Sequence, residues 1–267
     1  MIPGGVVLAL VLFAAVAPGF LTHLSPLLMG GNPFGPPSPH HLLGTDEFGR
    51  DILARIIYGT RPEVEITVGA VLIAGLLGTP LGIIGGYQRG VVEVMTSSAV
   101  NILISFPPIV LAMFVVAFLG PGVLHLTLII GFLYISVFAR LAFAQTVAIR
   151  DLDYVEAARA IGDSNLRIIW SHILPNVLGP LIVQASLSAS TALLLASGLS
   201  YLGLGVVPPT ANWGEMIATA QRFLLVDPRF ALWPSLALTL TILAINSLGD
   251  VLRDYLDPRS RTRASAF

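Results

Sequence analysis

The side chains that could carry out chemistry in this 267-residue chain are few, and two of the most useful types are missing. The chain has no cysteine, which excludes disulfides, thiolate nucleophiles and cysteine-ligated metals. All 14 of its basic residues are arginine, so it lacks the lysine of a nucleotide-binding P-loop. The adjacent His40 and His41, with His23 upstream, do not have the spacing of a helical metal site, and we expect no bound metal. No basic tract suggests nucleic-acid binding, and no nucleophile–base–orienter set suggests hydrolysis.

A polar stretch, "EAARAIGDSNLRIIWSHILPN" from Glu156 to Asn176, lies between two long apolar runs. It predicts two short helices with a break between them. The signals, in chain order, are Asp151 or Asp153 as a cap, Gly162 as the end of the first helix, Asp163-Ser164-Asn165 as the second start, and Pro175 as its close. The first helix carries little apolar bulk to insert into lipid, whereas its alanines permit close approach of another protein. We therefore expect a docking helix.

A second polar stretch, "LGTDEFGRDILARIIYGTR", covers residues 43–61. Its isoleucines and leucine recur with helical spacing, and Thr45 can cap the start. Arg50, Asp51 and Arg55 fall on the opposite side of this helix. The pattern predicts an interfacial amphipathic helix that leads into the next apolar run, or a rim that contacts a partner or substrate.

The elements that position these stretches are membrane spans. Charged residues make up 11% of the chain, less than half of the roughly 25% usual in soluble domains, and 55% are hydrophobic. A bilayer core needs about 20 apolar residues in a helix. Six segments qualify: about 3–21, 64–87, 96–119, 124–147, 176–202 and 230–248. The first resembles a signal peptide, but no positive charge precedes it, and we expect an uncleaved span.

Polar residues within the predicted spans are mild. Gln184, Ser188 and Thr191 share one side of the fifth span, and Asn101, Ser105 and Asn246 lie in other spans. These residues either line a pathway or form hydrogen bonds to neighbouring helices. In the second span, glycines at positions 78, 82 and 86 predict close helix packing, with a hinge near Pro80 as a further role.

The orientation of the spans follows from the arginines in the loops. If the N-terminus is cytoplasmic, nine arginines lie in or beside inner segments and five in outer segments. We therefore expect both termini and the loop at 148–175 in the cytoplasm, and the loops at 22–63 and 203–229 outside.

Four motifs in order resemble one family. "EAARAIG" followed by "HILPN" is similar to the EAA motif of ABC importer permeases, in the form found in the dipeptide/oligopeptide/nickel group. "LGTDEFGRDILARIIYGTR", "SFPPIVLA" and "LSYLGLGVVPPTANWGEMI" also resemble the C-type permease subunit of that group. Many members of the group have a longer, basic N-terminal tail than this chain.

The resemblance implies an all-α integral membrane protein of the bacterial plasma membrane, with six transmembrane helices of the type I importer fold. It implies three parts: residues 1–63 with the first span and an outer loop, a core at 64–258, and a cytoplasmic tail at 259–267. The chain would form half of a translocation pathway for di- or oligopeptides, glutathione-like compounds or chelated nickel. Its partners would be a B-type permease, one or two P-loop ATPases that hold ATP and Mg, and an extracytoplasmic binding protein.

The resemblance also implies site residues. ATPase-coupling residues would be Glu156, Ala157, Ala158, Arg159 and Gly162. Outer-loop contacts would be Trp213, Gly214, Arg50 and Asp51. The chain would be no enzyme and would bind no cofactor itself.

Two other classes compete with this interpretation. A secondary transporter that works without an ATPase usually needs an ionisable residue within the membrane. No carboxylate lies in the middle of a predicted span, and Glu63 and Glu65 lie at the outer end of the second. An intramembrane enzyme would need a catalytic Asp, Ser–Lys or metal set in the spans, and the sequence suggests none.

Overall fold

The computed structural model describes residues 2–256, so the predicted tail at 259–267 lies outside the described residues. That part of the chain is helical, apart from loops and one isolated bridge between Thr45 and Asp51. The helices are α1 (Ile2–Val16), α2 (Pro18–Leu21), α3 (Ile52–Tyr87), α4 (Val91–Ser105), α5 (Pro108–Leu119), α6 (Val123–Ile149), α7 (Asp153–Ala160), α8 (Asn165–Ile168), the π-helical turn η1 (Ile169–Ile173), α9 (Leu174–Tyr201), α10 (Trp213–Gln221) and α11 (Arg229–Leu256). Helices satisfy every backbone group internally, as a bilayer requires.

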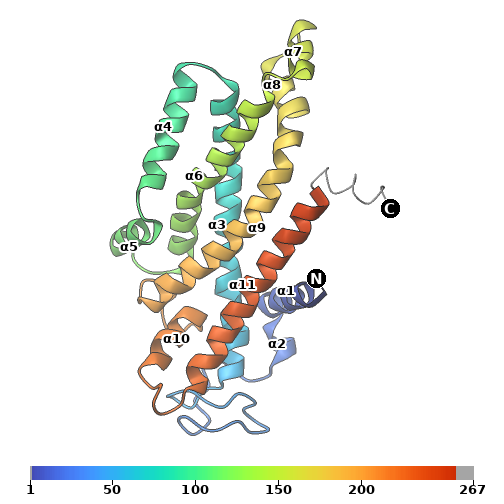
Figure 1. Cartoon of the computed structure of the whole chain (residues 1–267). Helices are drawn as coiled ribbons and strands as arrows, with labels where there is room; N and C mark the ends of the chain where they lie inside the picture. Colours follow the sequence, from blue (N-terminus) through green and yellow to red (C-terminus); the bar gives the residue numbers. More distant parts are fainter. Residues whose placement is uncertain (1, 257–267) are drawn as a thin grey trace.

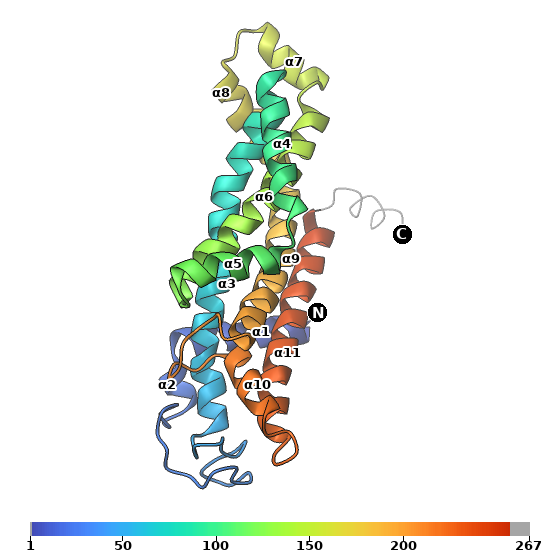
Figure 2. The same cartoon turned by 90° about the vertical axis from the view of Figure 1, so that its left-hand side faces the viewer.

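Four helical runs form the long bundle: α3, α6, the run from α8 through α9, and α11 (Figure 1). Each is long and apolar enough to cross a membrane. Helix α3 has 36 residues, or about 54 Å at 1.5 Å per residue, and reaches both ends of the bundle. The α7–α8 elbow lies at one end, and the 22–51 loop lies at the other, near α10 (Figures 1 and 2). The two predicted polar regions are therefore far apart.

Two of the six predicted spans differ from straight transmembrane helices. The third is broken: α4 and α5 meet at an angle of 84°, because Pro107 and Pro108 interrupt the helix after Phe106. The first is α1, a helix of 15 residues that lies across the long helices, followed by the short α2 (Figures 1 and 2). The described residues thus contain four spans, or five with the bent pair, by length and composition.

The predicted interfacial helix before the second span does not exist as a separate element. Helix α3 begins at Ile52 and continues without interruption to Tyr87, so the predicted start of the span near residue 64 is wrong. Its N-cap is Asp51, whose side chain accepts a hydrogen bond from the Ala54 N–H at 2.6 Å, and not Thr45. Thr45 instead accepts from the Gly35 N–H and donates to the Asn32 carbonyl within the loop.

The glycine stripe of α3 packs against α6, as predicted from its spacing. A Cβ atom at Gly82 would lie 2.2 Å from the Ala139 carbonyl oxygen, and one at Gly78 would lie 2.6 Å from that of Ile135. Only residues without a side chain allow this approach. Two apolar clusters fill the bundle along its length, and the one at the elbow end includes Val155 and Ala158. The elbow therefore shares its core with the spans.

Candidate functional site

The first half of the elbow is a short helix whose end depends on one glycine. Gly162 has φ of +90°, a left-handed conformation that favours glycine. Its N–H donates to the Arg159 carbonyl at 3.0 Å, and the Asp163 N–H donates to the Ala158 carbonyl at 3.1 Å. These two bonds form a Schellman motif, which satisfies the last carbonyls of α7 and turns the chain.

The second half of the elbow leads directly into a span. Ser164 caps α8 by accepting a hydrogen bond from the Arg167 N–H, as the sequence predicted. Two other predictions about this region are wrong. Leu152, and neither Asp151 nor Asp153, takes the N-cap position of α7. Pro175 does not close a helix, because the turn η1 carries α8 into α9 and places this proline in the first turn of α9, where its missing N–H is tolerated.

The predicted coupling residues divide into a buried and an exposed group. Ala158 is buried with Val155 in the apolar cluster at the elbow end of the bundle. Glu156, Ala157 and Arg159 are exposed, as is Gly162 at the turn. The elbow also exposes large apolar side chains that were not among the predicted site residues, and Ile161, Leu166 and Trp170 are the most exposed of them. A carboxylate beside apolar surface on a helix fixed from beneath is suited to binding another protein.

A tyrosine ties both halves of the elbow to the end of α3. The Tyr87 hydroxyl donates to Asn165 Oδ1 at 3.0 Å, at the start of α8. The Arg159 guanidinium of α7 lies over the Tyr87 ring, 5.2 Å from its centroid. Tyr87 was not among the predicted site residues, although a tyrosine at the end of an apolar run is typical of membrane interfaces.

A second set of contacts joins the same ends of α3, α4 and α6. Arg150, which is buried, donates to the Gly86 carbonyl at 2.5 Å and lies 3.3 Å from Glu93 of α4. Arg89 pairs with Asp151 at the surface. These contacts join the start of the elbow to α3, α4 and α6.

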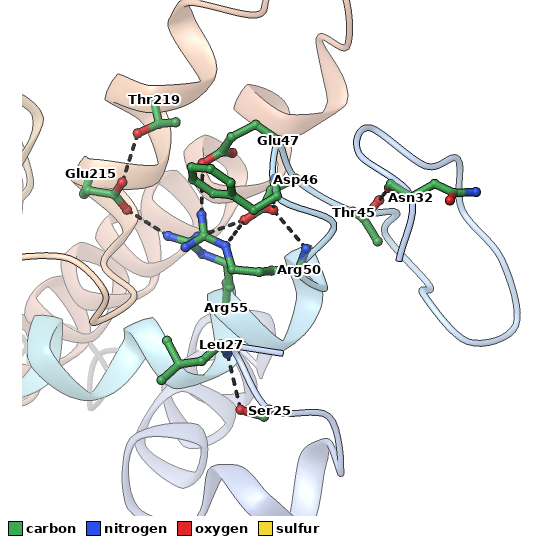
Figure 3. Close-up of polar contacts among 11 residues, drawn as sticks. Ser25, Leu27, Asn32, Thr45, Asp46, Glu47, Arg50, Arg55, Glu215 and Thr219 are labelled. Carbon is green, nitrogen blue, oxygen red and sulfur yellow. Dashed lines mark hydrogen bonds and ion pairs between the residues drawn. The ribbon is translucent and has the colours of Figure 1, made fainter. Parts of the chain in front are cut away.

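The opposite end of α3 carries a buried cluster of charges (Figure 3). Arg55 bridges Asp46 at 2.8 Å and Glu215 of α10 at 2.9 Å. Arg50 binds Asp46 at 2.6 Å and Glu47 at 2.9 Å. Burial, and next the neighbouring Asp46, raise the pKa of Glu47 above its usual value. The cluster holds the loop at 43–51 and α10 onto α3.

The residues predicted as outer-loop contacts lie inside this end of the fold. Arg50 and Asp51 are both buried, and Asp51 also lies 3.0 Å from His41 Nδ1. Trp213 is buried and donates from Nε1 to the Ile56 carbonyl at 3.0 Å. A Cβ atom at Gly214 would lie 2.1 Å from the Ser197 carbonyl oxygen, so glycine permits α10 to pack on α9. Within this chain these residues join α3, α9, α10 and the loop before α3 to one another.

Helix α3 carries two carboxylates in its interior because it begins before the predicted second span: Glu65 is exposed, and Glu63 is buried. Glu63 is an interior residue of α3 and is almost completely buried. It accepts hydrogen bonds from Ser197 Oγ at 3.1 Å and from Asn212 Nδ2 at 2.9 Å. Asn212 is also the N-cap of α10. Glu63 thus fixes α10 to α3 and α9. The sequence predicted Glu63 at the end of the second span because that span was predicted to begin near residue 64, whereas α3 begins at Ile52.

The predicted pathway residues do not form a single group. Gln184 lines a cavity of about 780 Å³ beside α9 and α11, and it donates to the buried Ser188 at 3.1 Å. Asn246 accepts a hydrogen bond from Ser190, which joins α11 to α9. Thr191 is exposed on α9 and bonds its own backbone. Asn101 and Ser105 lie on α4, and Asn101 lines a different cavity.

With this geometry in view, comparison with known proteins decides the family. Residues 78–262 match the model of the family described as binding-protein-dependent transport system inner membrane component. The chain belongs to this family. It is therefore a permease subunit, and its apolar helices make it a multi-pass inner-membrane protein.

The permease is similar over most of its length to three permease proteins whose names state a transported solute. It is 40% identical over 226 residues to the dipeptide transport system permease protein DppC of Alkalihalophilus pseudofirmus, covering 85% of this chain and 74% of the relative. It is 38% identical over 226 residues to the glutathione transport system permease protein GsiD of Pectobacterium atrosepticum, covering 85% and 75%. A putative peptide transport system permease protein of Brucella suis is 38% identical over 264 residues, covering 96% and 86%.

Solved structures place the permease in a known fold. The inward-facing MetNI methionine ABC transporter contains a chain that matches with a TM-score of 0.63 at 17% identity, covering 77% of this chain and 98% of that one. The fold is therefore that of ABC importer permeases, as the sequence predicted.

Proposed function

We propose that this permease forms one half of the translocation pathway of an ABC importer for di- or oligopeptides, or for a related small solute such as chelated nickel. Support for a peptide comes from its relatives, two of which are named for peptide transport and one for glutathione, itself a tripeptide. In this proposal α1 and the bent α4–α5 pair complete six spans, and both termini lie in the cytoplasm.

The partners in this proposal are a second, B-type permease, one or two cytoplasmic P-loop ATPases and an extracytoplasmic binding protein. ATP and Mg are held by the ATPases, and this chain binds no cofactor and breaks no bonds. Closure of the ATPases on ATP moves the elbow, and the spans switch between inward-open and outward-open states. ATP can drive this switch only because it interacts differently with the two states.

The observation that carries the proposal is the exposed Glu156 on a helix that is anchored from below. Val155 and Ala158 fix α7 in the core, while Glu156 and Ala157 are exposed and Arg159 lies over the ring of Tyr87. In the assembly, we assign Glu156 to a direct contact with the ATPase and Gly162 to the angle of the elbow. Ala158 acts from inside, as part of the anchor.

The remaining polar residues take separate roles in the proposal. Gln184, Thr191, Asn101 and Ser105 lie on cavities or on exposed helix surface and line the pathway. Asn246 joins α11 to α9 through its hydrogen bond with Ser190, whereas Ser188 is buried and orients Gln184 on the same helix. Trp213, Gly214, Arg50 and Asp51 shape the outer end, on which the binding protein docks.

The test is purification of the chain from native membranes in mild detergent, with an ATPase assay on the eluate. We expect a second permease and P-loop subunits to co-purify. Glu156→Lys should lose the ATPase subunits, because it places a positive charge where the partner meets a carboxylate. The matched control, Glu65→Lys, makes the same change on an exposed glutamate at the other end of α3 and should retain them. Full retention in Glu156→Lys, or a lone chain that moves solute in liposomes, would refute the proposal.

A further inference from the structure

The proposed function assigns no role to Arg140, an arginine within the fourth predicted span. Arg140 lies in α6, nine positions before the end of the helix at Ile149. Its side chain is exposed in the isolated chain. Within residues 2–256 it has no ion-pair or hydrogen-bond partner, in contrast to the buried Arg150 at the end of the same helix.

The position of Arg140 restricts what it can face. A cation within a membrane span is costly in contact with lipid, so such residues face protein or a water-filled cavity and mark substrate or ion pathways. An α-helix rises 1.5 Å per residue, so Arg140 lies about 13 Å along the axis from the inner end of α6. Arg140 thus lies well inside α6 and not in the loop that follows it. Arg140 therefore has a polar environment within the assembled protein.

The chain itself supplies part of this environment. Arg140 lines a cavity of about 250 Å³ between α6 and α4, which lie side by side in both views (Figures 1 and 2). Thr96, Ser97 and Asn101 of α4 provide its other polar side chains. The apolar lining consists of Val100, Phe143 and Ala144.

The chemistry of this lining selects an anion. A guanidinium has five N–H donors, the asparagine amide has two, and the hydroxyls can also donate. The lining includes no aspartate or glutamate. A guanidinium binds a carboxylate through two parallel hydrogen bonds, and it does so best where water is scarce. A carboxylate fits the size of the cavity and the charge of Arg140.

We propose that Arg140, with Asn101, binds the terminal carboxylate of the transported peptide as it passes between the two permease subunits. This inference rests on the proposed function and adds a chemical group and a residue to it. Arg140 offers the charge, and the α4 side chains orient the carboxylate toward α6. The binding protein captures the peptide outside, whereas this site acts only during passage.

The experiment uses the complete importer in proteoliposomes with saturating binding protein. The substrates are one peptide with a free carboxyl terminus and the same peptide with a C-terminal amide, chosen so that calorimetry gives equal affinity for the binding protein. We expect Arg140→Gln to lower the maximal import rate of the free acid about tenfold, since a charge-assisted hydrogen bond is lost. The amide should change less than about twofold, and KM should not change. Arg140→Lys should give an intermediate rate, because it keeps the charge without the paired geometry.

Assembly of the variants is checked by co-purification of all subunits and by basal ATPase activity. If Arg140→Gln does not assemble, Asn101→Ala supplies the same test, with a loss of about threefold confined to the free acid. Equal loss for acid and amide, or no loss for either, overturns the inference and leaves the peptide importer intact. Failure of the unmodified importer to move either peptide overturns the peptide assignment and this inference together.

Discussion

The two ends of α3 place charged residues in opposite environments. At the end that begins with Ile52, Asp46, Arg50 and Arg55 are buried, and each has an oppositely charged partner within the chain. At the elbow end the buried Arg150 also pairs with Glu93, but Glu156 and Arg159 of α7 are exposed. Both ends are helical and polar, so neither composition nor secondary structure distinguishes them. The difference lies in whether the chain itself supplies the partner.

This difference assigns a mechanical role to each end. Removing a charge from water costs several kcal/mol unless a partner compensates it, so a buried network fixes its elements in one arrangement. The outer network joins the 43–51 loop, α3 and α10 in this way (Figure 3). An exposed charge on a short helix costs little and remains available to another protein. Helix α3 thus connects a closed, internally paired end to an open end.

The largest effect is expected from breaking the buried end. Arg55→Met should destabilise the permease by about 3–5 kcal/mol, because the partly buried Glu215 loses its cation and the buried Asp46 keeps only Arg50. Chemical unfolding in detergent micelles, followed by tryptophan fluorescence, would measure this. Trp213 packs on the same outer segment and reports on it directly.

The same helix offers a matched control. Arg61 is six positions further along α3 and pairs with Glu65, but it is 68% exposed, whereas Arg55 is 2% exposed. Arg61→Met should cost at most about 1 kcal/mol. Similar losses for the two variants would mean that burial does not distinguish these ion pairs, and the comparison between the two ends would fail.

A smaller effect is expected at the turn of the elbow. Gly162→Ala should cost about 1–2 kcal/mol locally, because alanine disfavours φ of +90°, although no atom blocks its Cβ. We expect faster hydrogen exchange at the end of α7 and less solute imported per ATP. Gly198→Ala provides the control, since Gly198 is helical in α9 and its Cβ would also meet open space. Equal effects of the two changes would remove the special role of the turn.

Much of the fold follows from the sequence because apolar runs of bilayer length have few alternatives. The fourth and fifth spans, the glycine stripe on α3 and the Ser164 cap were all predicted from spacing and residue type. The break between α4 and α5 was missed, although two successive prolines mark it. Run length alone suggested a single straight span there.

The sequence does not predict that Asp46, Arg50 and Arg55 are buried. Residues 43–61 have the pattern of an amphipathic surface helix, and only the tertiary structure brings Glu215 to Arg55, 160 residues away. The same applies to Glu63, whose partners Ser197 and Asn212 lie on α9 and beside α10. A residue pattern reports which side of a helix is polar, but not whether another element covers that side.

The smallest effect tests the link between the open end and α3. Tyr87→Phe removes the hydroxyl that donates to Asn165 but keeps the ring beneath Arg159, so we expect a loss of about 1 kcal/mol in the stability of the elbow. Hydrogen exchange of the α7 and α8 amides would measure it, and a double-mutant cycle with Asn165→Ala would isolate this one bond. Tyr154→Phe is the control, because the Tyr154 hydroxyl lies 3.5 Å from its partner on an exposed part of the elbow. If the cycle gives no coupling between Tyr87 and Asn165, the elbow is attached to α3 by apolar packing and by the contact of Arg159 with the Tyr87 ring, and the open end is looser than its hydrogen bonds suggest.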